Sequence, residues 1–156
     1  MDREIAARRP PRAPRRPVLA SASEPRNVLI VDDEESTRIL LGHITSQDLG
    51  ARVALAGTCE AALHLAGEHV YDAILLDLMM PGIGGFEVLR RLRAVGPNRK
   101  TPILVVSVLS SHETIERCRL LGATAFVAKP IDRELVSTVL KSVLSPRRPK
   151  GPGSAR

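Results

Sequence analysis

Five short apolar runs alternate with five longer segments of helical periodicity between residues 27 and 144. The apolar runs cover residues 27–31, 52–56, 73–76, 103–106 and 124–127. A continuous apolar run bounded by turn residues is typical of a strand buried on both faces of a parallel sheet. Strands that alternate with helices favour a parallel sheet covered by helices on both faces, with right-handed connections. The pattern therefore predicts an α/β fold with five parallel strands.

The predicted helices cover residues 36–49, 59–68, 85–93, 113–121 and 132–144. Their apolar residues recur at the spacing that places one helix face against a core. Asp132 is expected to cap the last helix, because Asp is favoured at helix N-termini. The residues expected to face the core include Leu40, Leu41 and Ile44 in the first helix and Leu135, Val139 and Val143 in the last.

The basic character of the chain comes from its two ends. The net charge of the 156 residues is +6, and residues 1–26 and 145–156 carry +4 each, so residues 27–144 carry −2. Both ends are rich in Pro and Arg and lack apolar periodicity, which predicts disorder. We expect a disordered basic arm over 1–26, one globular domain over 27–144 and a disordered basic tail over 145–156.

Composition argues against several classes of protein. With no Trp, two Phe and one Tyr, the chain lacks an aromatic platform for stacking bases. Nucleic-acid binding through the arms is therefore a disfavoured alternative. No run approaches the ~18 apolar residues of a membrane span. Cys59 and Cys118 lie in predicted helices and are expected to be free thiols, which fits a cytoplasmic protein.

Polar side chains follow four of the five predicted strands. Asp32 and Asp33 follow the first strand, Asp77 the third, Ser107 the fourth and Lys129 the fifth. In a doubly wound sheet these carboxyl ends meet at one edge, where ligands bind. An isolated Asp77 would most simply cap the next helix, but its convergence with the other polar residues predicts a reactive site.

The charges at this edge require a cation. Three carboxylates bring −3 and Lys129 brings +1, so a divalent ion would make the site neutral. Two carboxylates ~5 Å apart repel by about 3 kcal/mol at an effective dielectric constant of ~20. Oxygen ligands suit Mg²⁺ (or Mn²⁺), and a carboxylate beside such an ion can attack a phosphoryl group. No P-loop is present, and no GxGxxG motif follows the first strand, which disfavours a nucleotide site.

In this order and at these spacings, the polar residues resemble the receiver domain of two-component response regulators. The matching segments are Val-Leu-Ile-Val-Asp-Asp-Glu at 28–34, Leu-Leu-Asp-Leu-Met-Met-Pro-Gly at 75–82, Ser107, and Ala-Lys-Pro at 128–130. The resemblance covers residues 27–144 and implies a flavodoxin-like, doubly wound sheet with strand order 2-1-3-4-5. It also implies a phosphorylation-controlled signalling switch in a phosphorelay that acts by protein–protein contact.

The resemblance implies a role for each residue of the acidic site. Asp77 would accept the phosphoryl group from a phosphohistidine of a histidine kinase or histidine phosphotransfer protein. Asp32, Asp33 and Asp77 would hold Mg²⁺ (or Mn²⁺), Asp33 directly, together with the backbone carbonyl of Met79. Such a domain is not a conventional enzyme, because it catalyses only its own phosphorylation and dephosphorylation.

The remaining implied roles concern phosphate binding and switching. Ser107 and Lys129 would bind the phosphoryl oxygens, and Phe126 would move inward as Ser107 approaches the phosphate. The peptide bond before Pro130 is expected to be cis. The fourth helix, fifth strand and fifth helix would form the face that contacts an unknown downstream protein, and a homodimer is possible.

The sequence departs from the usual receiver pattern at three points. Gly84 stands where many receivers have Asp, and Phe126 lacks the hydroxyl of the common Tyr. Met79 and Leu109 are apolar at the positions that flank the phosphate in receivers and influence attack by water. Slow self-dephosphorylation is therefore expected.

Two other readings share the reactive aspartate. The chain is alternatively a receiver module from a hybrid kinase. An aspartyl-phosphate phosphatase of the haloacid dehalogenase type is disfavoured, because that class needs a second Asp where Met79 stands and carries its nucleophile after the first strand.

Overall fold

A parallel five-stranded sheet forms the centre of the computed structural model, which describes residues 24–144 and residue 146. Its strands are β1 (Asn27–Val31), β2 (Arg52–Ala56), β3 (Ala73–Leu76), β4 (Ile103–Ser107) and β5 (Ala125–Ala128). Their order is β2-β1-β3-β4-β5, and every neighbouring pair is parallel. The predicted fold class and strand order are therefore confirmed.

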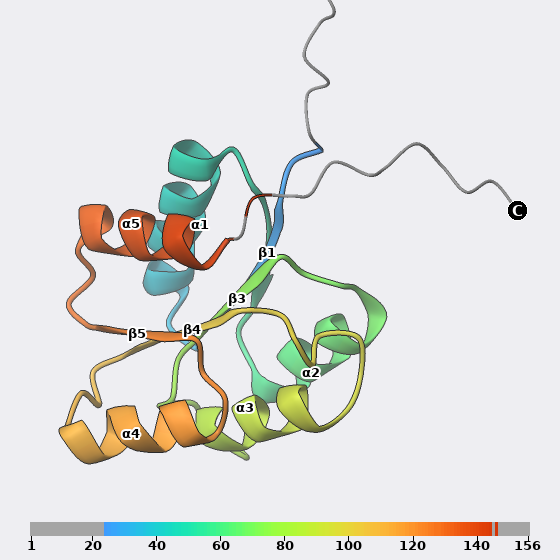
Figure 1. The fold of residues 1–156 in the computed structure, drawn as a ribbon, viewed down its shortest axis with the longest axis vertical. Helices are drawn as coiled ribbons and strands as arrows, with labels where there is room; N and C mark the ends of the chain where they lie inside the picture. The colour runs from blue at the N-terminus through green and yellow to red at the C-terminus, as the bar shows by residue number, and fades with distance from the viewer. Residues whose placement is uncertain (1–23, 145, 147–156) are drawn as a thin grey trace, which may run out of the picture.

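The five helices lie on the two faces of this sheet (Figure 1). α1 (Glu35–Leu49) and α5 (Arg133–Val143) cover one face. α2 (Cys59–Glu68) and α3 (Gly85–Ala94) cover the other, and α4 (His112–Leu120) packs beside α3 near β4 and β5. Each helix follows one strand, and α1 to α4 each return the chain to the next parallel strand, so the loops after the strands all open at the same edge of the sheet.

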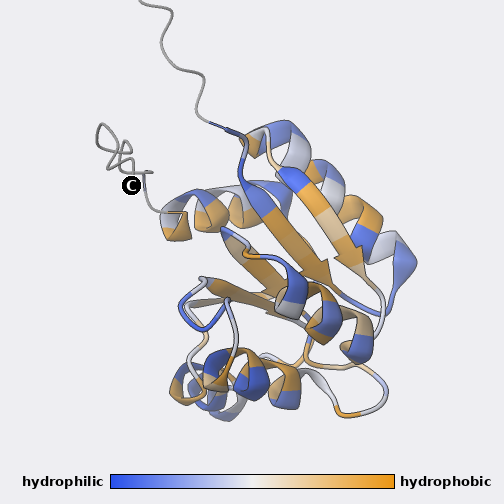
Figure 2. Cartoon of the chain, turned by 90° about the vertical axis from the view of Figure 1, so that its right-hand side faces the viewer, coloured by the Kyte–Doolittle hydropathy of each residue, from blue (hydrophilic) through white to orange (hydrophobic). Residues whose placement is uncertain are grey.

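The core lies between the sheet and the two helix layers. The central strands are apolar along their length, whereas each helix carries polar residues on its outer side (Figure 2). All residues of β3 and β4 are buried, and β1 is buried from its second residue onward. Complete burial explains why these strands read as unbroken apolar runs and not as alternating patterns.

Two of the expected core residues are exposed. Leu40 in α1 is 46% exposed, and Leu135 in α5 is 48% exposed. The buried residues of α5 are Val136, Ser137 and Leu140. At 100° per residue, Leu135 points about 140° away from the centre of that stripe. The prediction followed the apolar residues alone and so placed Leu135 inward, whereas Ser137 takes part in the buried face.

Side chains define the ends of several helices as the sequence suggests. Asp132 Oδ1 accepts a hydrogen bond from the Leu135 N–H at 2.9 Å, so the predicted cap of α5 is confirmed.

Most of the two predicted arms lies outside the described residues. Arg26 is described, and its carbonyl accepts the Arg52 N–H at 2.7 Å, so Arg26 is in contact with the folded domain.

Two further observations concern the described residues. Both cysteines are free and buried, as expected for small apolar side chains in helices. Within residues 24–144, no helix combines the length and the apolar character needed to cross a membrane.

Candidate functional site

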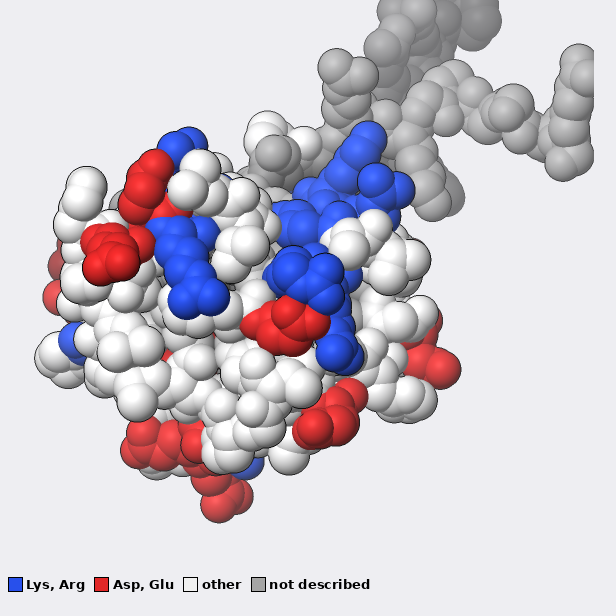
Figure 3. Space-filling view, turned by 90° about the horizontal axis from the view of Figure 1, so that it is seen from below, with Lys and Arg blue, Asp and Glu red and all other residues white. Residues whose placement is uncertain are grey.

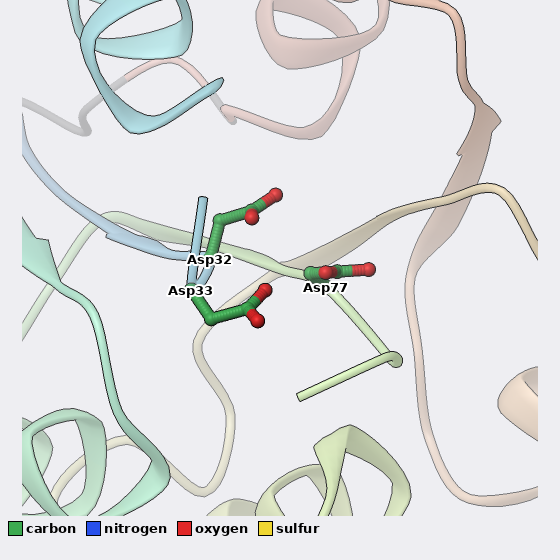
Figure 4. A group of neighbouring side chains, drawn as sticks. All are labelled: Asp32, Asp33 and Asp77. Atoms are coloured by element: carbon green, nitrogen blue, oxygen red, sulfur yellow. The ribbon is translucent and has the colours of Figure 1, made fainter. Parts of the chain in front are cut away.

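The site begins with two aspartates that follow neighbouring strands. β1 pairs with β3 in a register that sets Val31 beside Leu76, so Asp32 and Asp77 leave the sheet side by side. The Asp77 N–H donates to the Val31 carbonyl at 2.9 Å, which continues the strand pairing to the site itself. Figure 4 shows the side chains of Asp32, Asp33 and Asp77 gathered at this edge. Each can offer an oxygen such that all three lie within 4.8 Å of one another.

Lys129 joins the two buried aspartates. Its Nζ lies 2.8 Å from Asp32 Oδ2 and 3.7 Å from Asp77 Oδ2. The end of β5 delivers it, because the Lys129 N–H donates to the Ser107 carbonyl and extends the β4–β5 pairing. Burial lowers the pKa of Lys129, but the hydrogen bond to Asp32 and the attraction of Asp77 outweigh burial and raise it overall. Lys129 is therefore a fixed positive charge at neutral pH.

Asp77 is held in an environment that opposes its negative charge. Only 4% of its surface is exposed. Burial raises the pKa of Asp77, and the nearby charge of Asp32 adds to the rise, while Lys129 and the Met79 N–H lower it without cancelling the effect. A carboxylate held in this way gains stability from any further positive charge.

The acidic site fits a hard divalent cation. Asp32 Oδ1 accepts the Glu34 N–H at 2.9 Å, whereas the Asp33 carboxylate is exposed and has no hydrogen-bond or ion-pair partner among the described residues. Three carboxylates against one lysine leave an excess of negative charge at this edge. Oxygen donors with a free, solvent-facing carboxylate are the set that Mg²⁺ prefers, since it keeps several waters.

The other predicted site residues follow the same strand ends. Ser107 is fully buried, and its Oγ accepts the Leu109 N–H at 3.2 Å. Met79 donates its N–H to Asp77 Oδ1 at 3.3 Å and keeps its side chain 53% exposed. The Lys129–Pro130 peptide bond is cis. Ser107 thus ends β4, the strand next to β3, and Met79 follows Asp77 by two residues. Neither side chain is hydrogen-bonded to an aspartate carboxylate in the described contacts.

Phe126 lies in β5, which β4 separates from the strand that precedes Asp77. It is half-buried and packs against a small apolar group formed by Leu78, Val105 and Cys118. Leu78 directly follows Asp77, so a short apolar path joins the aspartate to Phe126. This packing, and not a polar contact, connects Phe126 to the site.

Sequence reasoning missed one residue that touches the site. Arg38 in α1 reaches back and donates Nη1 to the Asp32 carbonyl at 2.7 Å. A signal was present in the sequence, because Arg38 is the one Lys or Arg within the first helix and follows a run of four acidic residues, 32–35. The contact itself depends on how α1 packs against the end of β1, and no local sequence pattern shows that packing.

Comparison with known proteins decides the family. The model of the response regulator receiver domain matches residues 28–141, which is most of the chain. The chain belongs to the receiver domain family. Receiver domains bind Mg²⁺ in an acidic pocket and interact with histidine kinases or histidine phosphotransfer proteins. The resemblance inferred from the motifs is therefore confirmed.

Individual proteins resemble this chain in structure or in sequence. The chemotaxis response regulator CheY4 of Vibrio cholerae is 33% identical, with a TM-score of 0.72 over 77% of this chain and 99% of that chain. The receiver domain of the sensor histidine kinase PA1611 from Pseudomonas aeruginosa, described with a magnesium ion in its active-site cleft, is 26% identical with a TM-score of 0.70 over 77% of this chain and 98% of that one. The sensory/regulatory protein RpfC of Xanthomonas campestris is 34% identical over 78% of this chain, which spans only 17% of that protein.

Proposed function

We propose that this receiver is a phosphorylation-controlled signalling switch in which Asp77 accepts a phosphoryl group from a phosphohistidine. The observation that carries the proposal is the buried Asp32–Lys129–Asp77 arrangement, with Asp33 exposed beside it. In the transfer, the bond between phosphorus and the histidine nitrogen breaks while a bond between phosphorus and an Asp77 carboxylate oxygen forms. The donor histidine keeps the electron pair of the broken bond.

The surrounding groups would stabilise the transferred charge. Lys129 already reaches Asp77, so its ammonium group can neutralise a phosphoryl oxygen after transfer. Ser107 can exchange its present bond with the Leu109 N–H for donation to a phosphoryl oxygen. Phosphoryl transfer needs mainly positioning and charge neutralisation, which suits a site without a general base.

The carboxylates of Asp32, Asp33 and Asp77, with the backbone carbonyl of Met79, are the groups that we assign to Mg²⁺ or Mn²⁺. When bound, the ion would offset the repulsion between the aspartates and the incoming phosphoryl group. Asp33 would contact it directly, because its carboxylate is exposed and free of other partners among the described residues.

The output would be a change of packing on the face that α4, β5 and α5 form. Phosphorylation would draw Ser107 toward the phosphoryl group and let Phe126 shift within its apolar cluster. A shift of this kind biases two existing conformations. The downstream contact would then be to another protein, with homodimerisation as one form of that contact.

Acetyl phosphate provides the direct test. The full chain, incubated with acetyl phosphate and Mg²⁺, should gain the mass of one phosphoryl group in intact mass spectrometry. Neither EDTA-treated protein nor the Asp77→Asn variant should gain it. Equal labelling of Asp77→Asn would contradict the assignment of the acceptor.

A second candidate concerns where the phosphoryl group comes from and where it goes next, and leaves the site unchanged. Similarity to RpfC, a much longer sensory protein, favours a receiver that works as a module of a hybrid kinase. Such a receiver passes its phosphoryl group on to a histidine phosphotransfer protein. Rapid loss of label from Asp77 to such a protein, compared with slow loss in buffer, would support the relay role.

A further inference from the structure

We propose that Arg38 is a positioning residue that fixes the peptide group between Asp32 and Asp33 and thereby sets the Mg²⁺ affinity of the site. The inference rests on the proposed function, because it requires a divalent cation among the carboxylates. Arg38 itself would be neither a metal ligand nor a group that touches the phosphoryl group.

The need for such a residue comes from Asp33. Lys129 holds the carboxylates of Asp32 and Asp77 in place. The carboxylate of Asp33 is exposed and has no side-chain or backbone partner among the described residues. Its position therefore depends on the backbone that carries it, and above all on the peptide group that joins it to Asp32.

Arg38 is bonded to that peptide group. Its Nη1 donates to the Asp32 carbonyl at 2.7 Å, a short bond from a charged donor. The Asp32 N–H is held separately by the Ala56 carbonyl at 3.1 Å, as part of the β1–β2 pairing. The sheet thus fixes the backbone up to the Asp32 N–H. Arg38 fixes the next peptide group, between Asp32 and Asp33, and this group orients Asp33.

Gly57 provides the space in which Arg38 makes this contact. A Cβ atom at Gly57 would lie 2.9 Å from Arg38 Nη1 and 3.2 Å from Cζ. The φ angle of Gly57 is not positive, so the backbone does not require glycine there. The side chain that a substitution would displace is the end of a long, flexible arginine, so the fold should tolerate Gly57→Ala while Arg38 moves off the Asp32 carbonyl.

Two variants can distinguish the position of the Arg38 guanidinium group from its charge. Arg38→Met removes the hydrogen bond and the positive charge together, whereas Gly57→Ala keeps the charge and removes only its position. If Arg38 acted only by attracting or repelling ions, Gly57→Ala would leave Mg²⁺ binding unchanged. If Arg38 acts by holding the peptide group, both variants should weaken binding, and Gly57→Ala should have no further effect once Arg38 is gone.

The experiment is isothermal titration of the metal-free full chain with Mg²⁺ alone. Arg38→Met and Gly57→Ala should each raise the dissociation constant roughly tenfold, as expected for a residue that orients a metal ligand. The double variant should bind no more weakly than Arg38→Met. Thermal unfolding in EDTA should show that Gly57→Ala is folded.

Two matched variants serve as controls. Gly67→Ala adds a methyl group where nothing lies within 4 Å, and Arg52→Met removes an exposed charge from the start of β2. Both should bind Mg²⁺ like the wild type. A Gly57→Ala protein that also binds like the wild type, or single effects that add fully in the double variant, would overturn the inference. A wild-type chain that binds no Mg²⁺ would instead contradict the proposed function.

Discussion

Asp77 stores electrostatic repulsion in the metal-free protein. It is buried beside Asp32, and a single lysine faces the pair. Folding without a cation therefore brings like charges together, at a cost of about 3 kcal/mol for each pair at ~5 Å before Lys129 offsets part of it. The same repulsion favours binding of a divalent ion at the site, and it destabilises the folded protein when no ion is bound.

Asp77→Asn should therefore stabilise the metal-free protein at about pH 7 by about 1–2 kcal/mol, measured by urea unfolding in EDTA. Burial raises the pKa of Asp77 above its ordinary value of 3.8, so the native state holds this proton more tightly than the unfolded chain does. Asp77 therefore stabilises the wild-type fold at pH values below its ordinary pKa. This stabilisation is lost as the pH rises through the pKa that Asp77 has in the native state.

The gain from Asp77→Asn should consequently shrink as the pH is lowered toward about 4. Added Mg²⁺ should reverse the order of stability at neutral pH, because it binds the native wild type more tightly than the variant. An Asn variant that is less stable than the wild type in EDTA at about pH 7 would contradict this account.

We expect Met79 to influence how fast a phosphoryl group on Asp77 is lost. Its side chain is half-exposed at the site and carries no group that can orient a water molecule. Met79→Gln should shorten the lifetime of phospho-Asp77 by about tenfold, because an amide can position the attacking water. Met79→Leu is the matched control and should leave the lifetime near that of the wild type. The measurement is loss of the phosphoryl group from isolated protein after removal of acetyl phosphate.

At the scale of elements, α3 approaches the site through its first residue. The Gly85 N–H donates to the Leu78 carbonyl at 3.1 Å, which folds the loop after β3 back on itself. A Cβ atom at Gly85 would collide with the Asp77 carbonyl oxygen and with Leu78 Cα. The start of α3 and the backbone of Asp77 are thus in direct contact, and no flexible side chain lies between them.

Gly85→Ala should destabilise the fold by about 3 kcal/mol and reduce labelling of Asp77 by acetyl phosphate, because backbone must move to accommodate the methyl group. Urea unfolding and mass spectrometry measure the two effects. Gly67→Ala, within α2 and with nothing inside 4 Å, is the matched control and should be neutral or slightly stabilising. A Gly85→Ala protein as stable as the Gly67→Ala protein would refute the close contact.

At the scale of the whole molecule, charge is divided between two regions. Residues 85–121 carry seven Lys or Arg against three Glu, so this segment is +4 within a domain of net −2. Figure 3 shows groups of Lys and Arg side chains on the face that α3 and α4 form, with acidic side chains between and around them. The rest of the domain is therefore −6, which places the acidic site in the negative part of the molecule and favours a cation there.

Asn98 joins distant parts of the fold at the edge opposite the site. Its Nδ2 donates to the Ala66 and His69 carbonyls at 2.6 and 2.7 Å, and its Oδ1 accepts the Tyr71 N–H at 2.9 Å. One buried side chain thus ties the end of α2 and the start of β3 to the loop before β4. Removing it would leave several buried backbone groups without partners.

Asn98→Leu should lower the free energy of unfolding by about 2–4 kcal/mol, because each buried backbone group left unpaired costs about 1 kcal/mol or more. Lys100→Ala, an exposed neighbour, should change stability little. The Mg²⁺ affinity of the folded Asn98→Leu protein should match that of the wild type, since the substitution lies at the other edge of the sheet. A stability equal to that of Lys100→Ala would contradict this role.

The sequence alone was enough for the order and type of the elements and for the polar residues at the strand ends. Fully buried parallel strands must be apolar throughout, so β3 and β4 can be recognised as continuous apolar runs. Buried aspartates at strand ends, such as Asp32 and Asp77, are costly unless they meet a cation. Helix faces were less certain, as Leu40 and Leu135 show, because a buried stripe also admits polar residues such as Ser137.

Only the tertiary structure decided the contacts between residues that are distant along the chain. Lys129 reaches Asp32 across 97 positions, and Asn98 holds the Tyr71 backbone across 27. Arg38 and Gly57 come together because α1 packs back over the end of β1 beside the loop after β2. Local patterns report which face of an element is apolar, whereas these contacts depend on how the elements pack, and that is where the orientation of Asp33 is set.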